Sequence, residues 1–310
     1  MRARYATVAV DYENLKHLYR TLGLPPGPES QVMYEAVADR FLELFARHDV
    51  RATLFVIGED LREPGNRRML RRFAAAGHEI ANHTLTHPFG MRRLSRAEKA
   101  REIDDAHHII EDASGQAVVG YKAPAHDVDR ETIDLVEGRG YLYDASVYPS
   151  FFNPLLNLVF RVVGNNRPLG LGDWQCMLAP NRPYVPGERF WRRGHRKLVE
   201  FPITQVPAIR FPFYSTVMFT LGYPSFALSY AAVRQMRFCT YVFHSFDLLA
   251  ADDPGVDLAL RRHPSLRHPL ERRLRMVSSV LRALSRSARC VTYREAVTTP
   301  AIRRELLGAA

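Results

Sequence analysis

Short apolar runs alternate along this chain with segments of helical period. The apolar runs predict buried strands at residues 7–10, 52–57, 79–82, 118–121, 198–201, 239–243 and 289–292. Between them, apolar residues recur with the spacing of a helix face, which predicts helices over residues 31–47, 66–76, 95–113, 130–137 and 270–284. Apolar strands that alternate with helices are typical of a parallel sheet covered by helices. The pattern therefore predicts an α/β fold, and within that class a barrel.

Three further features bear on domain organisation. Ser95 followed by Glu98 forms a capping-box pattern, so a helix should begin there. Residues 150–197 are rich in Pro, Gly, Asn and aromatic side chains and predict an irregular insertion over one end of the sheet. Residues 257–310 predict a basic, helical C-terminal part. We expect one catalytic domain over residues 1–310, since a single barrel of this size is common.

The expected compartment is inferred from the lack of a recognisable secretory signal or membrane-spanning segment in the sequence. The apolar run near the N-terminus is too short for a secretory signal, and residues 211–233, although uncharged, are interrupted by Pro212 and Pro224. We interpret residues 211–233 as buried barrel or an apolar lip. The chain has three cysteines, far apart and odd in number, which argues against a disulfide framework. A cytoplasmic location is expected.

Charge narrows the choice of partners. The formal net charge is +10, and ten arginines lie within residues 257–294. A basic face of this kind attracts anionic lipid or a phosphorylated substrate, but it is equally typical of a solvated helix. No nucleic-acid-binding signature is present, so nucleic acid is not expected as a partner.

The strongest chemical signal is the segment His83-Thr-Leu-Thr-His87, followed by Pro88. On one helical turn, both imidazoles would point the same way and could share a metal ion. The alternative is a pair of surface histidines on a turn.

Other polar residues follow predicted strands. Asp11 and Glu13 end the first strand and could serve as a base and a metal ligand, although an N-capping Asp explains the pattern as well. Lys122 and His244 end two further strands, and each has an ordinary alternative as a surface lysine or a core histidine. Because the carboxyl ends of parallel barrel strands converge on one mouth, we expect all of these side chains to meet there.

These residues resemble the polysaccharide deacetylase family, whose members carry a NodB homology domain and are classed with carbohydrate esterase family 4. Asp11 is similar to the catalytic base of the first motif, and Glu13 to its metal-binding acid. The family's His-Ser/Thr-x-x-His motif matches residues 83–87 in full. The resemblance implies a distorted barrel of seven or eight (β/α) units.

The later motifs match less closely. Lys122-Ala-Pro124 resembles an Arg-x-Pro motif, and the substitution keeps the charge but loses the planar fork of arginine. Residues 140–146, with Asp144, are similar to the family's Tyr-Asp-Ser-Ser stretch, and His244 corresponds to the histidine of the last motif. Trp174 and Trp191 are both candidates for the tryptophan motif.

The resemblance implies a metal-dependent hydrolase that removes an acyl group, by expectation acetyl, from an amino sugar. One divalent ion, by expectation Zn²⁺, would be held by Glu13, His83 and His87. Asp11 would act as the base, His244 as the acid, and Lys122 would hold Asp11. Pro124, Asp144 and Trp174 are predicted to support the site or bind substrate.

Substrate and partners are less constrained. A lipid-linked or cell-envelope glycan precursor fits a cytoplasmic enzyme at the inner face of a membrane, and the basic C-terminal part would suit a lipid phosphate. The oligomeric state stays open. Two alternatives remain: a non-sugar amide or imide hydrolase of allantoinase type, and a glycan-binding member without activity.

Overall fold

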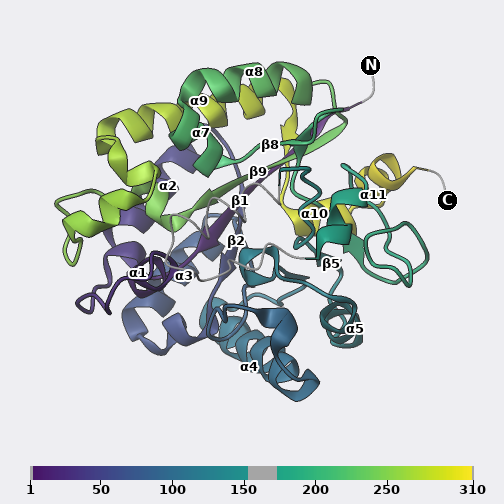
Figure 1. Cartoon of the computed structure of the whole chain (residues 1–310), viewed down its shortest axis with the longest axis horizontal. Coiled ribbons are helices and arrows are strands. Elements are labelled where there is room, and N and C mark those ends of the chain that lie inside the picture. The colour runs from purple at the N-terminus through teal and green to yellow at the C-terminus, as the bar shows by residue number, and fades with distance from the viewer. Residues whose placement is uncertain (1–2, 153–172, 309–310) are drawn as a thin grey trace.

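The computed structural model, described over residues 3–152 and 173–308, has a curled parallel sheet at its centre with helices around it (Figure 1). Successive strands pair side by side from β1 to β6, while β9 pairs with the other edge of β1 and β10 with its first residues. Every pairing in this eight-stranded sheet is parallel. The strands are β1 (Tyr5–Tyr12), β2 (Ala52–Val56), β3 (Glu79–Asn82), β4 (Gly120–Tyr121), β5 (Tyr143–Asp144), β6 (Val199–Glu200), β9 (Phe238–His244) and β10 (Arg289–Cys290). The predicted strands and their parallel arrangement are confirmed.

The sheet closes on itself through side chains. In the described residues no backbone ladder joins β6 to β9, but Thr240 of β9 donates its backbone N–H to Thr204 Oγ1 at 2.8 Å. Aromatic rings fill the interior behind this seam, with Phe201 contacting both Phe238 and Tyr293 at centroid distances of 5.3 and 5.0 Å. The result is the predicted distorted barrel, with its own core.

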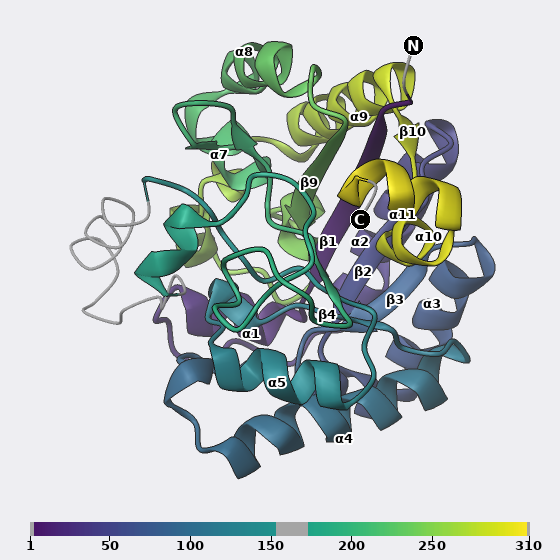
Figure 2. The ribbon, with the colours of Figure 1, turned by 90° about the vertical axis from the view of Figure 1, so that its right-hand side faces the viewer.

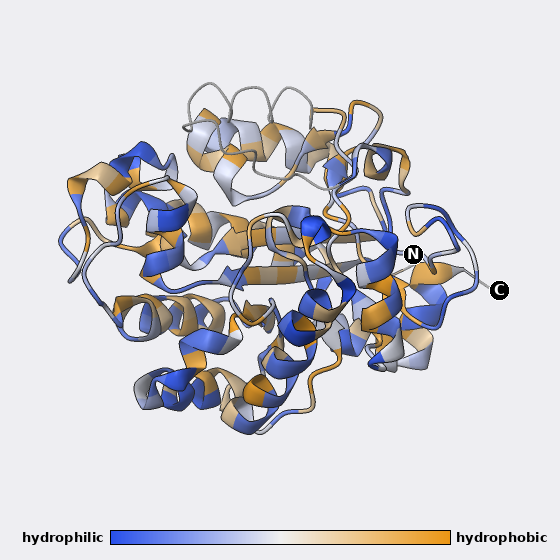
Figure 3. Ribbon diagram, turned by 60° about the horizontal axis from the view of Figure 1, so that its bottom comes forward, coloured by the Kyte–Doolittle hydropathy of each residue, from blue (hydrophilic) through white to orange (hydrophobic). Residues whose placement is uncertain are grey.

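Helices cover the outside of the barrel (Figure 2). Figure 3 shows apolar residues concentrated on the central strands, whereas the outer helices carry polar and apolar residues on different faces. The capping box at Ser95 is present and begins α4, which ends at Gly115 in a left-handed conformation with φ 71°. The helices are α1 (Leu15–Thr21), α2 (Ala36–Arg47), α3 (Pro64–Ala75), α4 (Arg96–Ser114), α5 (Arg130–Gly138), α7 (Ser215–Leu221), α8 (Tyr223–Val233), α9 (Leu270–Ser287), α10 (Tyr293–Thr298) and α11 (Pro300–Leu307).

One segment differs in form from what the sequence suggested. Residues 211–233 form the short strand β8 (Phe211–Pro212), which pairs with β7 (Gln205–Val206), followed by helices α7 and α8. Leu228 of α8 is 79% exposed, whereas Phe213, Met218, Phe219 and Phe226 are buried in the hydrophobic core. The segment is therefore mainly a helical layer that packs on the core, and its interpretation as an apolar lip stays a prediction. The predicted insertion falls partly outside the described residues, since 153–172 are not among them. The assignment of residues 1–310 to one catalytic domain stays a prediction.

The basic C-terminal part has a structural component. Arg273 of α9 is 1% exposed and donates hydrogen bonds to the carbonyl oxygens of Asp247, Leu249 and His268. This arginine therefore anchors α9 to the turn that follows β9, and its charge is not part of an exposed basic face. Within residues 3–152 and 173–308, no helix combines the length and the apolar character needed to cross a bilayer.

Because Thr204 closes the seam, we expect Thr204→Val to destabilise the fold by about 1–3 kcal/mol. The substitution keeps the branched shape but leaves the buried Thr240 N–H without an acceptor. Urea unfolding measures the change. Thr220→Val removes an exposed hydroxyl that bonds within its own helix and serves as the control. Equal stability of the two variants would show that the seam does not depend on this bond.

Candidate active site

The site begins at the carboxyl end of β1, which is paired on both sides. Asp11 is in register with Phe55 of β2 on one side and His244 of β9 on the other. Glu13 follows the strand, where Ser245 accepts a hydrogen bond from its backbone N–H and donates one to its carbonyl oxygen. Asp11 and Glu13 are both 5% exposed. Strand pairing therefore fixes both carboxylates at the predicted mouth.

The two histidines of the predicted pair lie on an irregular loop after β3. Thr84 and His87 adopt left-handed backbone conformations, with φ of 71° and 55°. The side chain of Asn82 accepts from Thr84 N–H at 2.7 Å, and Thr84 Oγ1 accepts from His87 N–H at 3.1 Å. The expected helical turn is wrong, because these side-chain bonds replace helical backbone bonds. Strained conformations of this kind are concentrated at functional sites.

The loop nevertheless brings His83 and His87 together with Glu13. One ligand atom from each of the three residues lies within 4.8 Å of the others, and His87 Nε2 is 3.5 Å from Glu13 Oε1. His83 Nδ1 donates to the carbonyl oxygen of Lys122 at 2.7 Å, which leaves its Nε2 free as a ligand. Two imidazoles and a carboxylate are a donor set that zinc takes in hydrolases. The residues present therefore fit a divalent metal ion.

The electrostatics of this cluster also favour a cation. Burial, followed by the nearby Asp11 and Asp60 carboxylates, raises the pKa of Glu13 to about 8. Burial lowers the pKa of His83 to about 4, although Asp11 opposes the shift. Burial and the neighbouring His83 hold the pKa of His87 well below its usual value. Neutral imidazoles beside a carboxyl group that resists ionisation are in the state in which a metal ion can replace one proton.

Lys122 forms a buried ion pair with Asp11. Its Nζ lies 2.6 Å from both carboxylate oxygens, and the lysine is 1% exposed. Burial alone would raise the pKa of Asp11, but the Lys122 ammonium, helped by His83 and His244, holds it well below the usual value. Asp11 is therefore a carboxylate at neutral pH.

His244 completes the group at the end of β9. Its Nε2 is 3.9 Å from Asp11 Oδ2, its ring stacks on Phe246, and its backbone N–H donates to Asp247. Burial lowers the pKa of His244, while Asp11 and Asp247 oppose this. Arg273 holds the turn after His244 through the carbonyl oxygens described above.

The three predicted supporting residues have different surroundings. Pro124 begins a short 3-10 turn, Pro124–His126, directly after the Lys122 segment. Asp144 is buried and accepts from Ser146 Oγ at 2.6 Å, and this oxygen in turn accepts from the Ala123 N–H at 2.8 Å. Asp144 thus contacts the site only through the backbone that carries Lys122.

Trp174 stands apart from the cluster. Its side chain is 65% exposed and lines a surface hollow of about 440 Å³. None of the lining residues belongs to the metal-ligand set; they are Trp174, Gln175, Leu178, Arg189, Trp191 and Arg192. A role for Trp174 in binding substrate stays a prediction.

Two histidines near the site were not found from the sequence. The His17 ring lies 5.5 Å from that of His87, and His17 bonds to Asp60 at 3.2 Å. His126 stacks on Tyr148 and has a left-handed backbone with φ 59°. His17 occupies an ordinary apolar position of α1, and His126 lacks the spacing of a known motif, so neither had a sequence signal. His17, Glu59 and Asp60 form a second cluster of possible metal ligands. In this cluster Lys16 Nζ already lies 3.0 Å from the carboxylates of both Glu59 and Asp60.

Comparison with known sequences gives a partial match. Residues 27–143 match the family described as Polysaccharide deacetylase. A chitooligosaccharide deacetylase of Sinorhizobium fredii is 38% identical over 84 residues, which are 27% of this chain and 38% of that protein. The chain thus covers well under half of the length of this relative. The family match contains His83, His87 and Lys122, but Asp11, Glu13 and His244 lie outside it.

Two solved structures superpose on nearly the whole length of this chain. A putative polysaccharide deacetylase from Mycobacterium smegmatis superposes with a TM-score of 0.59 at 16% identity, covering 99% of this chain and 92% of that one. The Bc1960 peptidoglycan N-acetylglucosamine deacetylase gives a TM-score of 0.50 at 12% identity, covering 100% and 90%. At these identities the likeness shows a shared fold. The resemblance inferred from the sequence is thus confirmed for residues 27–143, which are similar to the polysaccharide deacetylase family, and the solved structures share the fold.

Proposed function

We propose that this protein is a metal-dependent hydrolase that removes the N-acetyl group from an amino sugar. The observation that carries the proposal is the convergence of Glu13, His83 and His87 within ligand distance. The ion pair of Asp11 and Lys122 lies directly beside them. The family match and the names of the relatives support the substrate class.

Each residue has a proposed role. A divalent ion held by Glu13, His83 and His87 would supply Lewis-acid polarisation of the amide carbonyl and a water of lowered pKa. Asp11 accepts a proton from the attacking water, and His244 donates one to the leaving amine. The proton that Asp11 accepts has a short path to the amine, since His244 Nε2 is 3.9 Å from Asp11 Oδ2.

Lys122 has two opposing effects on Asp11. It keeps Asp11 ionised throughout the neutral range, and it also makes the carboxylate a weaker base. A water whose pKa is already lowered by a metal ion needs only a weak base. Metal dependence and a base paired with a lysine are therefore consistent with each other.

We extend the proposal to a lipid-linked or cell-envelope precursor as the substrate. Phe151 follows the strand-end segment after β5 and is 52% exposed, and Leu178 is 58% exposed. Arg210 lies over the Phe151 ring at 5.6 Å. Exposed apolar side chains beside arginine suit an amphiphilic substrate with anionic groups. A location at the inner face of a membrane is part of the same proposal.

The proposed reaction is tested by acetate release from acetylated amino-sugar oligomers, their lipid-linked forms and a cyclic ureide. We expect release from the sugars and none from the ureide. Asp11→Asn should lower turnover by about 10²–10⁴-fold with metal content unchanged, because only the base is lost. His83→Ala should lose the metal. Asp252→Asn and His195→Ala alter exposed residues and are the matched controls. Turnover close to wild type in Asp11→Asn, or full metal content in His83→Ala, would contradict the assignment.

Metal binding at pH 7 should release about one proton, because Glu13 has a pKa of about 8 while His83, at about 4, is already neutral. Isothermal titration calorimetry with Zn²⁺ in two buffers of different ionisation enthalpy measures the number. The part of the release that comes from Glu13 should be missing in Glu13→Gln at pH 7, whereas release from a metal-bound water of lowered pKa would remain. Equal proton release by wild type and Glu13→Gln would mean that Glu13 is already ionised in the metal-free protein.

Lys122→Met should raise the pKa of Asp11, since burial would then act without the opposing ammonium. The acidic limb of the kcat/KM profile should move to higher pH. Lys122→Arg keeps the charge and should leave the limb near its wild-type position. An acidic limb that does not move in Lys122→Met would show that it reports a group other than Asp11.

A further inference from the structure

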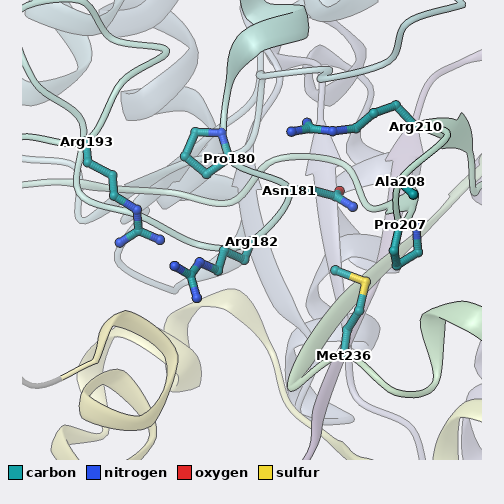
Figure 4. A pocket seen from close by; sticks show the side chains of 8 residues that line it. All are labelled: Pro180, Asn181, Arg182, Arg193, Pro207, Ala208, Arg210 and Met236. Atoms are coloured by element: carbon teal, nitrogen blue, oxygen red, sulfur yellow. The ribbon is translucent and has the colours of Figure 1, made fainter.

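A second hollow, of about 480 Å³, lies on the surface outside the candidate active site (Figure 4). It is lined by the late insertion, the turn between β7 and β8, and the residue shortly before β9. The lining residues are Pro180, Asn181, Arg182, Arg193, Pro207, Ala208, Arg210 and Met236. None of them is a proposed metal ligand or catalytic residue. Apart from Arg210, which lies over the Phe151 ring in the proposed substrate region, the proposed function assigns no role to these residues.

Two arginines converge at one side of the hollow. The guanidinium groups of Arg182 and Arg193 point toward one another in Figure 4. Burial, followed by repulsion from Arg182, lowers the pKa of Arg193. In the described part of the chain, neither side chain has an acidic partner or a hydrogen bond, and residues 153–172 contain no Asp or Glu in their sequence. Two like charges therefore face one another without compensation.

Acidic partners are used elsewhere on the same segment. Arg196, three residues after Arg193, bonds to Asp134 at 2.6 Å and to Glu137 at 2.8 Å on α5. Arg196 thus pairs with acidic residues, whereas Arg193 on the same segment faces another arginine, Arg182. Two arginines that face each other are typical of sites where a bound oxyanion supplies the negative charge between them.

The backbone holds both arginines in place. Asn181, next to Arg182, exchanges two amide hydrogen bonds with the backbone of Gln205, at 2.7 and 2.8 Å. Arg193 pairs with Pro186 in an antiparallel bridge, followed at once by a contact between Gly187 and Gly194. A side chain at Gly194 would place its Cβ 2.2 Å from the Cα of Gly187, so the close approach requires glycine. Little ordering of the backbone would be needed on binding a ligand, although both exposed arginine side chains would have to be ordered.

A third guanidinium is held at the same hollow. Arg210 Nη1 donates to the carbonyl oxygens of Ala179 at 2.8 Å and Pro149 at 3.3 Å. Ala208 and Arg210 both have left-handed backbones, with φ of 65° and 52°. This turn bears strain without a glycine, and its effect is to direct Arg210 to the hollow. Burial lowers the pKa of Arg210, which reflects the cost of holding this third positive charge at the hollow.

Apolar side chains make up the rest of the lining. Pro180, Pro207 and Met236 contribute hydrocarbon surface beside the guanidinium groups. We infer that this hollow is a second binding site, for a phosphate-type oxyanion carried on a small apolar group, with Arg182 and Arg193 as its anion ligands. Planar guanidinium groups match the oxygens of phosphate, and the apolar lining accommodates the attached group.

Binding of butyl phosphate to the full chain tests the inference, with inorganic phosphate and butanol as comparisons. Isothermal titration calorimetry should show saturable binding of butyl phosphate, weaker binding of phosphate, and none of butanol. Arg182→Gln with Arg193→Gln should weaken butyl phosphate binding by roughly tenfold or more, since two charge-assisted contacts are lost. Arg62→Gln with Arg303→Gln removes two exposed arginines whose side chains have no ion-pair partner among the described residues, and this variant should bind like the wild type. Melting temperatures verify that both double variants are folded.

The source of the oxyanion is decided with vesicles. Arginine-dependent binding to phosphatidylcholine vesicles containing phosphatidic acid, above binding to phosphatidylcholine alone, identifies a lipid headgroup. Binding of butyl phosphate without such vesicle binding identifies a soluble phosphomonoester. Either result supports the site. Absence of saturable binding to both probes, or equal binding by wild type and the Arg182/Arg193 variant, would overturn it. Because the readout is binding, the result is independent of deacetylase activity.

Discussion

The pairing of β1 on both of its edges is the constraint on which this site depends. Hydrogen bonding to β2 and β9 fixes the register of Asp11 beside Phe55 and His244. Residues more than two hundred positions apart in the chain therefore become lateral neighbours. The same pairing brings Ser245 onto the backbone of Glu13. The proposed base, metal ligand and acid are in this way positioned by backbone bonds, which are less adaptable than side-chain packing.

Burial sets the chemistry of the residues so positioned. The Lys122 ammonium compensates the charge of Asp11, whereas Glu13 has no comparable partner and keeps a high pKa. The imidazoles of His83 and His87 are held neutral by the same desolvation. A buried polar group of this kind costs stability unless it is paired, which is consistent with the divalent cation proposed for this cluster. The hollow with Arg182 and Arg193 has the reverse imbalance, an excess of positive charge.

Left-handed backbone conformations occur both at the proposed metal site and at the hollow with the arginines. The loop that carries His83 and His87 contains two left-handed residues, and so does the turn that carries Arg210. Neither turn uses glycine at those positions, so each conformation is maintained by side-chain and carbonyl bonds around it. The surrounding barrel supplies the packing energy that supports such turns.

Much of this arrangement could be predicted from local patterns. Apolar runs predicted the parallel strands, because fully buried strands lack polar alternation. The capping box placed the start of α4, because its bonds are local. The spacing of His83 and His87 identified the metal-site candidate, and strand ends placed Asp11, Lys122 and His244 at one mouth. These signals lie within a few residues of each other along the chain.

What depends on distant contacts could be known only from the tertiary structure. The loop conformation between His83 and His87 differs from a helical turn because Asn82 and Thr84 bond to its backbone. His17 meets His87, and Arg182 meets Arg193, only after separate segments fold together. Arg273 looked like part of a basic surface but is buried against three carbonyl oxygens. The sequence alone thus determined which elements form and which residues end them, because those choices rest on short-range periodicity and capping. The structure decided which side chains face one another and how their charges balance, because both depend on packing between segments far apart in the chain.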